Sequence, residues 1–101
     1  FSPQNMALVL DNLVSNSQKS NSTKICLKFE KVGEKTKISY RDNGTGFAKD
    51  DDLIRIFEFG WSGTGGTGIG LYNVHRVINR MQGSIEARRN SPQGALFEIE
   101  I

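Results

Sequence analysis

The chain has 101 residues, enough for one domain with a single modest hydrophobic core. Thirteen Lys and Arg residues against eleven Asp and Glu residues give a formal charge of +2, and the charges are interspersed, so the composition does not indicate nucleic-acid binding. No apolar run approaches the roughly 20 residues of a membrane-spanning helix, and a single cysteine cannot form an internal disulfide. We therefore expect a cytoplasmic domain without membrane contact of its own, in a parent protein that can carry an anchor elsewhere.

The hydrophobic pattern alternates helices with pairs of strands. Pro3 is suited to the first turn of a helix, Asp50 is a candidate cap for a short helix, and Gly83 is a candidate stop. The predicted elements are a helix over 3–20, strands over 24–32 and 35–42, a short helix over 50–57, a helix over 69–82, and strands over 84–89 and 95–101. This order predicts an α+β fold: a two-layer sandwich with helices on one face of a mostly antiparallel, mixed sheet.

The first predicted helix carries a polar stripe at the edge of its apolar face. Asn12, Asn16 and Lys19 fall within about 60° of one another around the helix axis. An Asn side-chain oxygen is a hard, neutral ligand that suits Mg²⁺, and Lys19 adds positive charge one turn beyond Asn16. The stripe therefore indicates a cation and phosphate site, although the same residues would also serve simply to solvate the helix.

An acidic residue ends the second predicted strand. Ile38, Tyr40 and Asp42 share one face of that strand because side chains alternate. A carboxylate at the end of an apolar face must find hydrogen-bond donors, and the exocyclic amine of adenine is a suitable one. Gly44 and Gly46 follow directly, and their lack of Cβ atoms allows the backbone to approach a flat ring closely.

A second glycine-rich block opens the third predicted helix. Residues 63–68 match the dinucleotide fingerprint, and Glu86 lies near the distance expected of a ribose-binding acid. That fingerprint belongs in the first strand–helix unit of a much longer parallel sheet, and these residues stand too late in too short a chain for that context. A phosphate loop would need a Lys where Ile69 or Leu71 stands. The start of an amphipathic helix still suits phosphate, which makes nucleotide-binding candidates of Gly66, Thr67, Gly68, Ile69, Gly70 and Leu71.

Four motifs occur in a fixed order: residues 12–19 as an N box, 42–46 as a first glycine box, 57–59 as an F box and 66–71 as a second glycine box. Together they resemble the ATP-binding motifs of sensor histidine kinases, within the superfamily of gyrase, Hsp90, histidine kinase and MutL ATPases. The resemblance spans residues 3–101 and implies a Bergerat-type ATP-binding fold with ATP and Mg²⁺ as cofactors. It assigns Asn16 to Mg²⁺, Asp42 to adenine, Lys19 to the phosphates, and Gly68 and Gly70 to the phosphate end of the site.

The same resemblance implies a function and its partners. Residues 1–101 are expected to form one catalytic domain, a fragment of a larger kinase, that donates the γ-phosphate of ATP to a histidine on a separate dimerisation domain of the same parent protein. A response regulator would receive the phosphoryl group afterwards, as in two-component signalling. The alternative is a non-catalytic, nucleotide-sensing or anti-sigma-type module of the same superfamily.

Some residues depart from the family pattern. Asn12 stands where gyrase-like members carry a water-activating Glu, so it is a weak catalytic candidate, alongside Lys19, and efficient hydrolysis by a clamp-type ATPase is not expected. Ala95 stands where a hydroxyl residue is common, and Ser20 where an aromatic residue is common. His75, the one histidine, has no acidic neighbour in sequence and is not expected to accept phosphate.

Overall fold

The computed structural model describes residues 3–61 and 69–101. Its elements, in chain order, are α1 (Pro3–Lys19), β1 (Ile25–Val32), β2 (Lys35–Asp42), α2 (Asp52–Arg55), α3 (Gly70–Arg80), β3 (Ser84–Arg89) and β4 (Ala95–Glu100). Every predicted element is present in the predicted order, and the short helix α2 is the one whose length differs most from the expectation. Within the described ranges, no helix is long and apolar enough to cross a membrane.

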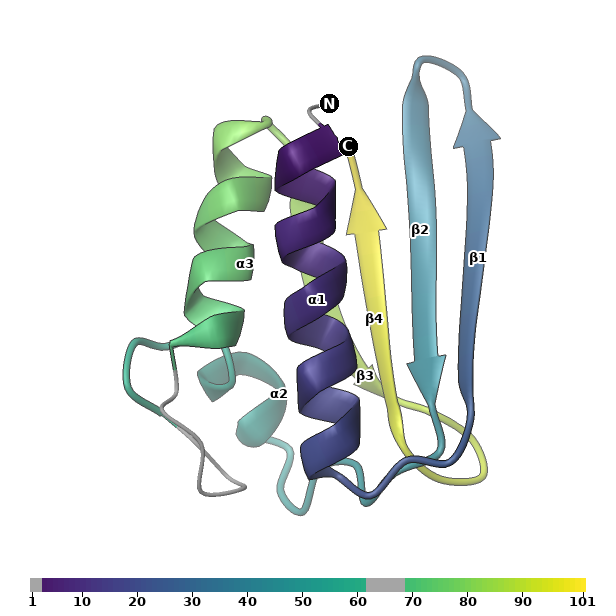
Figure 1. Ribbon diagram of the computed structural model, residues 1–101, viewed down its shortest axis with the longest axis vertical. Coiled ribbons are helices and arrows are strands. Elements are labelled where there is room, and N and C mark those ends of the chain that lie inside the picture. The colour runs from purple at the N-terminus through teal and green to yellow at the C-terminus, as the bar shows by residue number, and fades with distance from the viewer. Residues whose placement is uncertain (1–2, 62–68) are drawn as a thin grey trace.

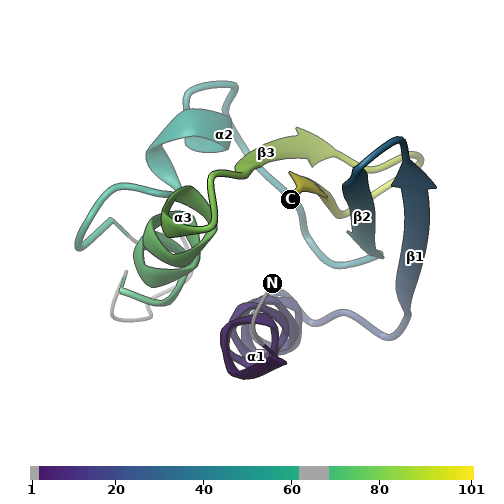
Figure 2. The same cartoon turned by 90° about the horizontal axis from the view of Figure 1, so that it is seen from above.

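The four strands form one sheet in the order β1-β2-β4-β3 (Figure 1). All three pairings are antiparallel; Tyr40 of β2 lies opposite Phe97 of β4, and Ile99 of β4 lies opposite Ile85 of β3. Figure 2 shows α1 and α3 together on one side of this sheet. The two-layer α+β prediction is therefore confirmed, with antiparallel pairing throughout these four strands.

The hydrophobic core fills the space between the two long helices and the sheet. Each long helix contributes residues at spacings of three and four, which lie on one face. The core residues that are most completely enclosed are Val9, Leu13, Ile38, Tyr40, Val74, Ile78, Phe97 and Ile99. Burying an aliphatic or aromatic side chain contributes about 1.5–3 kcal/mol, so these contacts fix the rotation of α1 and α3 and leave their polar flanks outside the core.

The β1–β2 hairpin extends past the helical layer (Figure 1). All eight residues of β1 are exposed, including the large apolar side chains of Ile25, Leu27 and Phe29. β1 is therefore held by its backbone pairing with β2 rather than by burial in the core.

Two sequence predictions about helix ends are corrected by the structure. Asp50 does not cap α2: the helix begins at Asp52, no side chain caps it, and the Asp50 carboxylate forms an ion pair with Arg89 of β3. At the end of α3, Gln82 takes the left-handed conformation, with φ of 60°. Gly83 is required instead by close packing, because a Cβ atom there would overlap the carbonyl oxygen of Glu100.

Candidate functional site

Asp42 lies at the end of β2 with only 2% of its surface exposed. Its Oδ1 atom accepts hydrogen bonds from the backbone N–H groups of Gly44 and Ala95, each at 3.0 Å. Its Oδ2 atom accepts one from the Ser17 hydroxyl at 2.7 Å. The prediction that a carboxylate here must find donors is confirmed, and the donors within the chain come from three separate segments.

Ser17 is the site residue that the sequence analysis missed. It lies on α1, is completely buried, and its hydroxyl is 2.8 Å from the hydroxyl of Tyr40 as well as bonded to Asp42. The sequence did hold a signal: Ser17 continues the buried series Val9 and Leu13 at a spacing of four, and a polar residue in such a series requires a partner.

Glycines pack the backbone tightly around Asp42. A Cβ atom on Gly44 would lie 2.6 Å from the hydroxyl oxygen of Ser22, and Gly46 adopts a positive φ of 71° beside Gly94. Two side chains from the β3–β4 turn support the same loop: Asn90 donates to the carbonyl of Asp42, and Gln93 donates to the carbonyl of Gly44, both at 2.9 Å. The first glycine box is thus wedged between the end of α1 and this turn.

Asn12, the first residue of the polar stripe of α1, lies against the start of α3. A Cβ atom on Gly70, the first residue of α3, would lie 2.6 Å from the side-chain oxygen of Asn12, so these two residues are in close contact. The Asn12 amide nitrogen donates to the Leu8 carbonyl at 2.8 Å. Asn16 is half-buried and Lys19 is exposed in the last turn, and neither side chain has a hydrogen bond or ion pair within the described part of the chain.

Gly66, Thr67 and Gly68 lie outside the described residues. Beyond them, Ile69 is 39% exposed, and Leu71 packs in the core with 8% exposed. Because the Leu71 side chain is buried, a nucleotide contact from this residue would come from its backbone. The first turn of a helix has backbone N–H groups without partners inside the helix, and such groups suit an anion, so the first turn of α3 stays a candidate phosphate site.

His75 is half-buried on α3 and already engaged. Its ring lies 5.5 Å from that of Phe57, centre to centre, and its Nδ1 atom is 3.3 Å from the side-chain nitrogen of Asn79. An amide nitrogen can only donate, so Nδ1 is the acceptor of this pair. The described contacts around His75 include no carboxylate.

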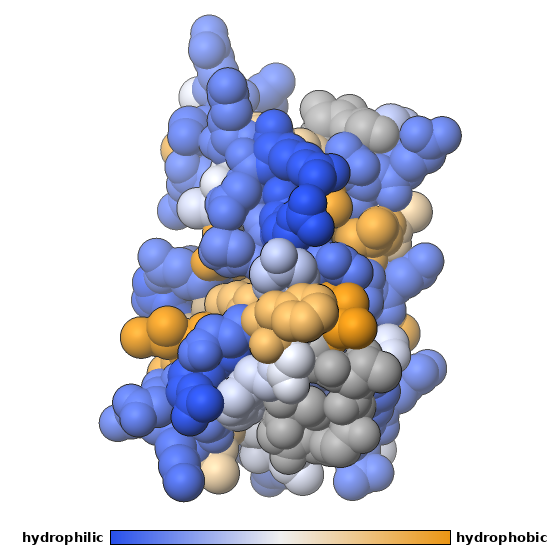
Figure 3. Space-filling model, turned by 90° about the vertical axis from the view of Figure 1, so that its left-hand side faces the viewer, coloured by the Kyte–Doolittle hydropathy of each residue, from blue (hydrophilic) through white to orange (hydrophobic). Residues whose placement is uncertain are grey.

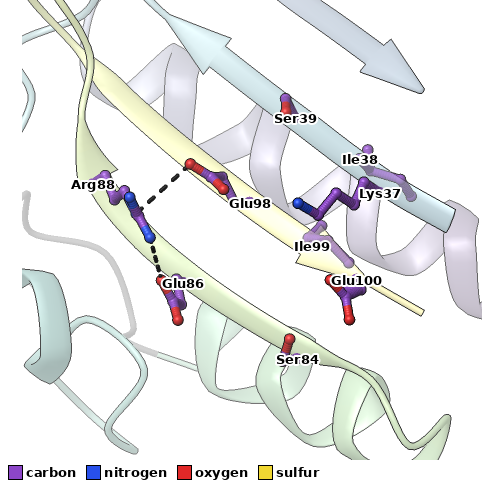
Figure 4. Close-up of a pocket in the computed structure, with 9 residues that line it drawn as sticks. All are labelled: Lys37, Ile38, Ser39, Ser84, Glu86, Arg88, Glu98, Ile99 and Glu100. Carbon is purple, nitrogen blue, oxygen red and sulfur yellow. Dashed lines mark hydrogen bonds and ion pairs between the residues drawn. The ribbon is translucent and has the colours of Figure 1, made fainter. Parts of the chain in front are cut away.

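A hollow of about 140 Å³ lies on the opposite face of the sheet, away from the helices (Figure 4). Three of its charged side chains are paired: Arg88 contacts Glu86 at 2.8 Å and Glu98 at 3.6 Å. Both contacts raise the pKa of Arg88, and the contact with Glu86 raises it more. Glu86, the residue at the distance of a ribose-binding acid, thus lies on this face and not beside the glycine blocks.

Figure 3 views the side of the molecule formed by α2 and α3, where apolar side chains gather across the middle. Among the exposed apolar residues of the chain, Ile54 of α2 has 78% of its surface exposed, and Phe59, which follows α2, has 69%. The Phe59 ring also makes an edge contact with Tyr72 of α3, with ring centres 5.1 Å apart.

Comparison with known proteins shows that the chain is similar in sequence and fold to sensor kinases and histidine kinases. The chain is 30% identical over 102 residues to a probable C4-dicarboxylate sensor kinase of Bacillus subtilis, an alignment covering 93% of this chain and 19% of that protein. Its fold matches the nucleotide-free catalytic domain of the histidine kinase ThkA with a TM-score of 0.84, at 28% identity, over 99% of this chain and 68% of that one.

A further match is the crystal structure of full-length ShkA in complex with AMPPNP, with a TM-score of 0.82 at 30% identity, over 95% of this chain and 21% of that one. In the alignment with the Bacillus subtilis kinase, the chain spans about a fifth of the length of that protein. The model of one ATPase family matches residues 2–101, and the resemblance predicted from the four motifs is confirmed. The chain belongs to the family of histidine kinase-, DNA gyrase B- and HSP90-like ATPases.

Proposed function

We propose that this domain binds ATP with Mg²⁺ and donates the γ-phosphate to a histidine on a separate domain of its parent protein. The observation that carries the proposal is the buried carboxylate of Asp42. A carboxylate has about four lone-pair positions, and described residues fill three of them. One acceptor position on Oδ2 remains for an N–H donor, which the exocyclic amine of adenine supplies.

The surroundings of Asp42 fit the rest of such a nucleotide. Gly44 packs against Ser20 and Ser22 with no room for a side chain and donates its backbone N–H to Asp42, so the backbone of this loop is held beside the carboxylate. Asn16 supplies a neutral oxygen for Mg²⁺, which takes its other ligands from phosphates and water. Lys19 and the first turn of α3, with Ile69 and Gly70, supply positive charge and N–H donors at the phosphate end, together with residues 66–68.

The described residues at the proposed phosphate end supply positive charge and N–H donors, and none of them is a strong base. Asn12 carries an amide, and its nitrogen is already bonded to Leu8. When bound, Mg²⁺ neutralises charge on the phosphates during transfer. A nucleophile brought from another domain, such as a histidine, would not require a base at Asn12.

Two observations support a histidine-bearing partner domain. The similar proteins are named as sensor kinases and histidine kinases, and most of the length of the Bacillus subtilis kinase lies outside the region that this chain matches. The exposed apolar side chains of Ile54 and Phe59, the latter in contact with Tyr72 of α3, provide apolar surface on which that domain can dock. A response regulator would receive the phosphoryl group in a later step.

Calorimetric titration tests the binding half of this proposal. ATP should bind in the presence of Mg²⁺ and more weakly after Mg²⁺ is removed with a chelator. GTP, which carries a carbonyl oxygen in place of the adenine amine, should bind at least about 100-fold more weakly, because two acceptors would face each other at Asp42. Equal affinities for ATP and GTP would remove Asp42 from base recognition.

A further inference from the structure

Three buried polar side chains form a chain of hydrogen bonds that links the helical layer to the sheet. Tyr40 is 1% exposed, Ser17 is 0% exposed and Asp42 is 2% exposed. Tyr40 and Asp42 lie two residues apart on the same face of β2, and Ser17 reaches both from α1.

The direction of these hydrogen bonds follows from the chemistry of the three groups. An ionised carboxylate can only accept, so the single hydroxyl proton of Ser17 points to Asp42 Oδ2. Burial, more than the nearby Asp42 charge, raises the pKa of Tyr40 even though its hydrogen bond with Ser17 lowers it. Tyr40 therefore keeps its proton and donates it to Ser17, whose oxygen is the acceptor within reach at 2.8 Å.

We propose that Ser17, supported by Tyr40, is the positioning residue that sets the base selectivity of this site, by fixing the Asp42 carboxylate so that it presents one acceptor to the base. This inference rests on the proposed function, in which the adenine amine binds at Asp42. The two backbone donors hold Oδ1, and the Ser17 hydroxyl holds Oδ2, so the carboxylate cannot rotate without breaking hydrogen bonds. A fixed acceptor favours an amino-purine and disfavours a purine with a carbonyl oxygen at the same position.

The test compares ADP with inosine diphosphate, which carries that carbonyl oxygen, by calorimetry on the whole chain. The variants are Ser17→Ala, Tyr40→Phe, the double variant, and Ser15→Ala as a control on the same helix. The double variant removes the phenol hydroxyl that Ser17→Ala alone would leave buried without a partner, so it preserves folding best. Urea unfolding establishes that each protein is folded before titration.

In Ser17→Ala and in the double variant, the preference for ADP over inosine diphosphate should fall by roughly tenfold, which corresponds to about 1.4 kcal/mol. Tyr40→Phe should lower the preference less, and Ser15→Ala should leave it unchanged. If folded Ser17 variants bind both nucleotides more weakly by the same factor, Ser17 has only a structural role and the inference is wrong. If the wild-type chain does not bind ADP at all, the proposed function fails, and this inference fails with it.

Discussion

Gly94 lies directly against the backbone carbonyl of Asp42. Gly94 has a positive φ of 112°, and a Cβ atom on it would overlap that carbonyl oxygen. The turn between β3 and β4 therefore touches the residue that ends β2, about fifty positions earlier in the chain. This contact sets how far the turn can move from the candidate site.

Replacing Gly94 with Ala should destabilise the fold by more than about 3 kcal/mol, because it combines an unfavourable φ with a steric overlap. Gly33→Ala is the matched control: Gly33 also has a positive φ, of 63°, but nothing lies within 4 Å of its would-be Cβ atom. That variant should lose only about 1–2 kcal/mol. Urea unfolding of the two variants measures the difference, and equal losses would show that the Gly94–Asp42 contact is not tight in solution.

The resemblance assigns Asn16 to Mg²⁺, which makes Asn16→Ala a test of metal binding. The side chain is half-buried and has no hydrogen bond within the described residues, so stability should change by less than about 0.5 kcal/mol. The Mg²⁺ concentration required for half-maximal ATP binding should rise at least tenfold, because even the loss of a residue that only orients a metal ligand weakens metal binding by about this factor. Gln18→Ala, an exposed neighbour, is the control. Superimposable Mg²⁺ titrations of wild type and Asn16→Ala would remove Asn16 from the metal site.

Asp42→Asn should invert the base preference. The Asn oxygen can keep both backbone donors, Gly44 and Ala95, while its nitrogen donates to Ser17 and presents an N–H to the base. ADP binding should weaken by about 100-fold, and inosine diphosphate should become the better ligand. Asp42→Ala is a poorer test, because it would leave the hydroxyl and both backbone N–H groups without their acceptor. Calorimetry with both nucleotides decides the matter, and an unchanged preference for ADP would contradict the assignment of Asp42 to adenine.

The raised pKa of Tyr40 predicts a pH dependence of stability. The ordinary pKa is 10.0 and burial moves the folded-state value upward, so the folded chain holds the proton more tightly than the unfolded chain. Below pH 10 both states are protonated and this group adds no slope; as the pH rises above 10, the unfolded state loses the proton first and stability falls. Tyr40→Phe should lack this part of the decline. The free energy of unfolding of both proteins is measured between pH 8 and 11, and an equal decline in the two proteins would contradict the prediction.

Patterns along the chain predicted the parts of the site that depend on local sequence. The positions of α1 and α3 follow from apolar residues at helical spacing, and the buried Asp42 follows from strand alternation. Contacts between distant segments were not predictable in this way. The Ser17–Asp42 bond requires α1 to lie over the end of β2, and 25 positions separate the two residues.

The wrong prediction for Asp50 has the same cause. A carboxylate before a helix is a reasonable cap, but the fold brings Arg89 of β3 next to Asp50, and the ion pair competes for the side chain. Gly83 shows a similar effect, because its lack of a Cβ atom serves the contact with Glu100 at the end of β4 rather than a left-handed turn. In both cases a contact with a distant segment, and not the local helix-end preference of the residue, determines its role.

Phosphoryl transfer from γ-labelled ATP tests the central claim most directly. The chain is incubated with Mg²⁺ and labelled ATP, alone and together with the histidine-bearing domain of its parent protein. We predict acid-labile label on the added domain, loss of that label with Asp42→Asn, and no label on this chain alone. Label on the isolated chain that disappears in His75→Gln, or an added domain that stays unlabelled while ATP is bound, would contradict it; the second result would favour a nucleotide-sensing module.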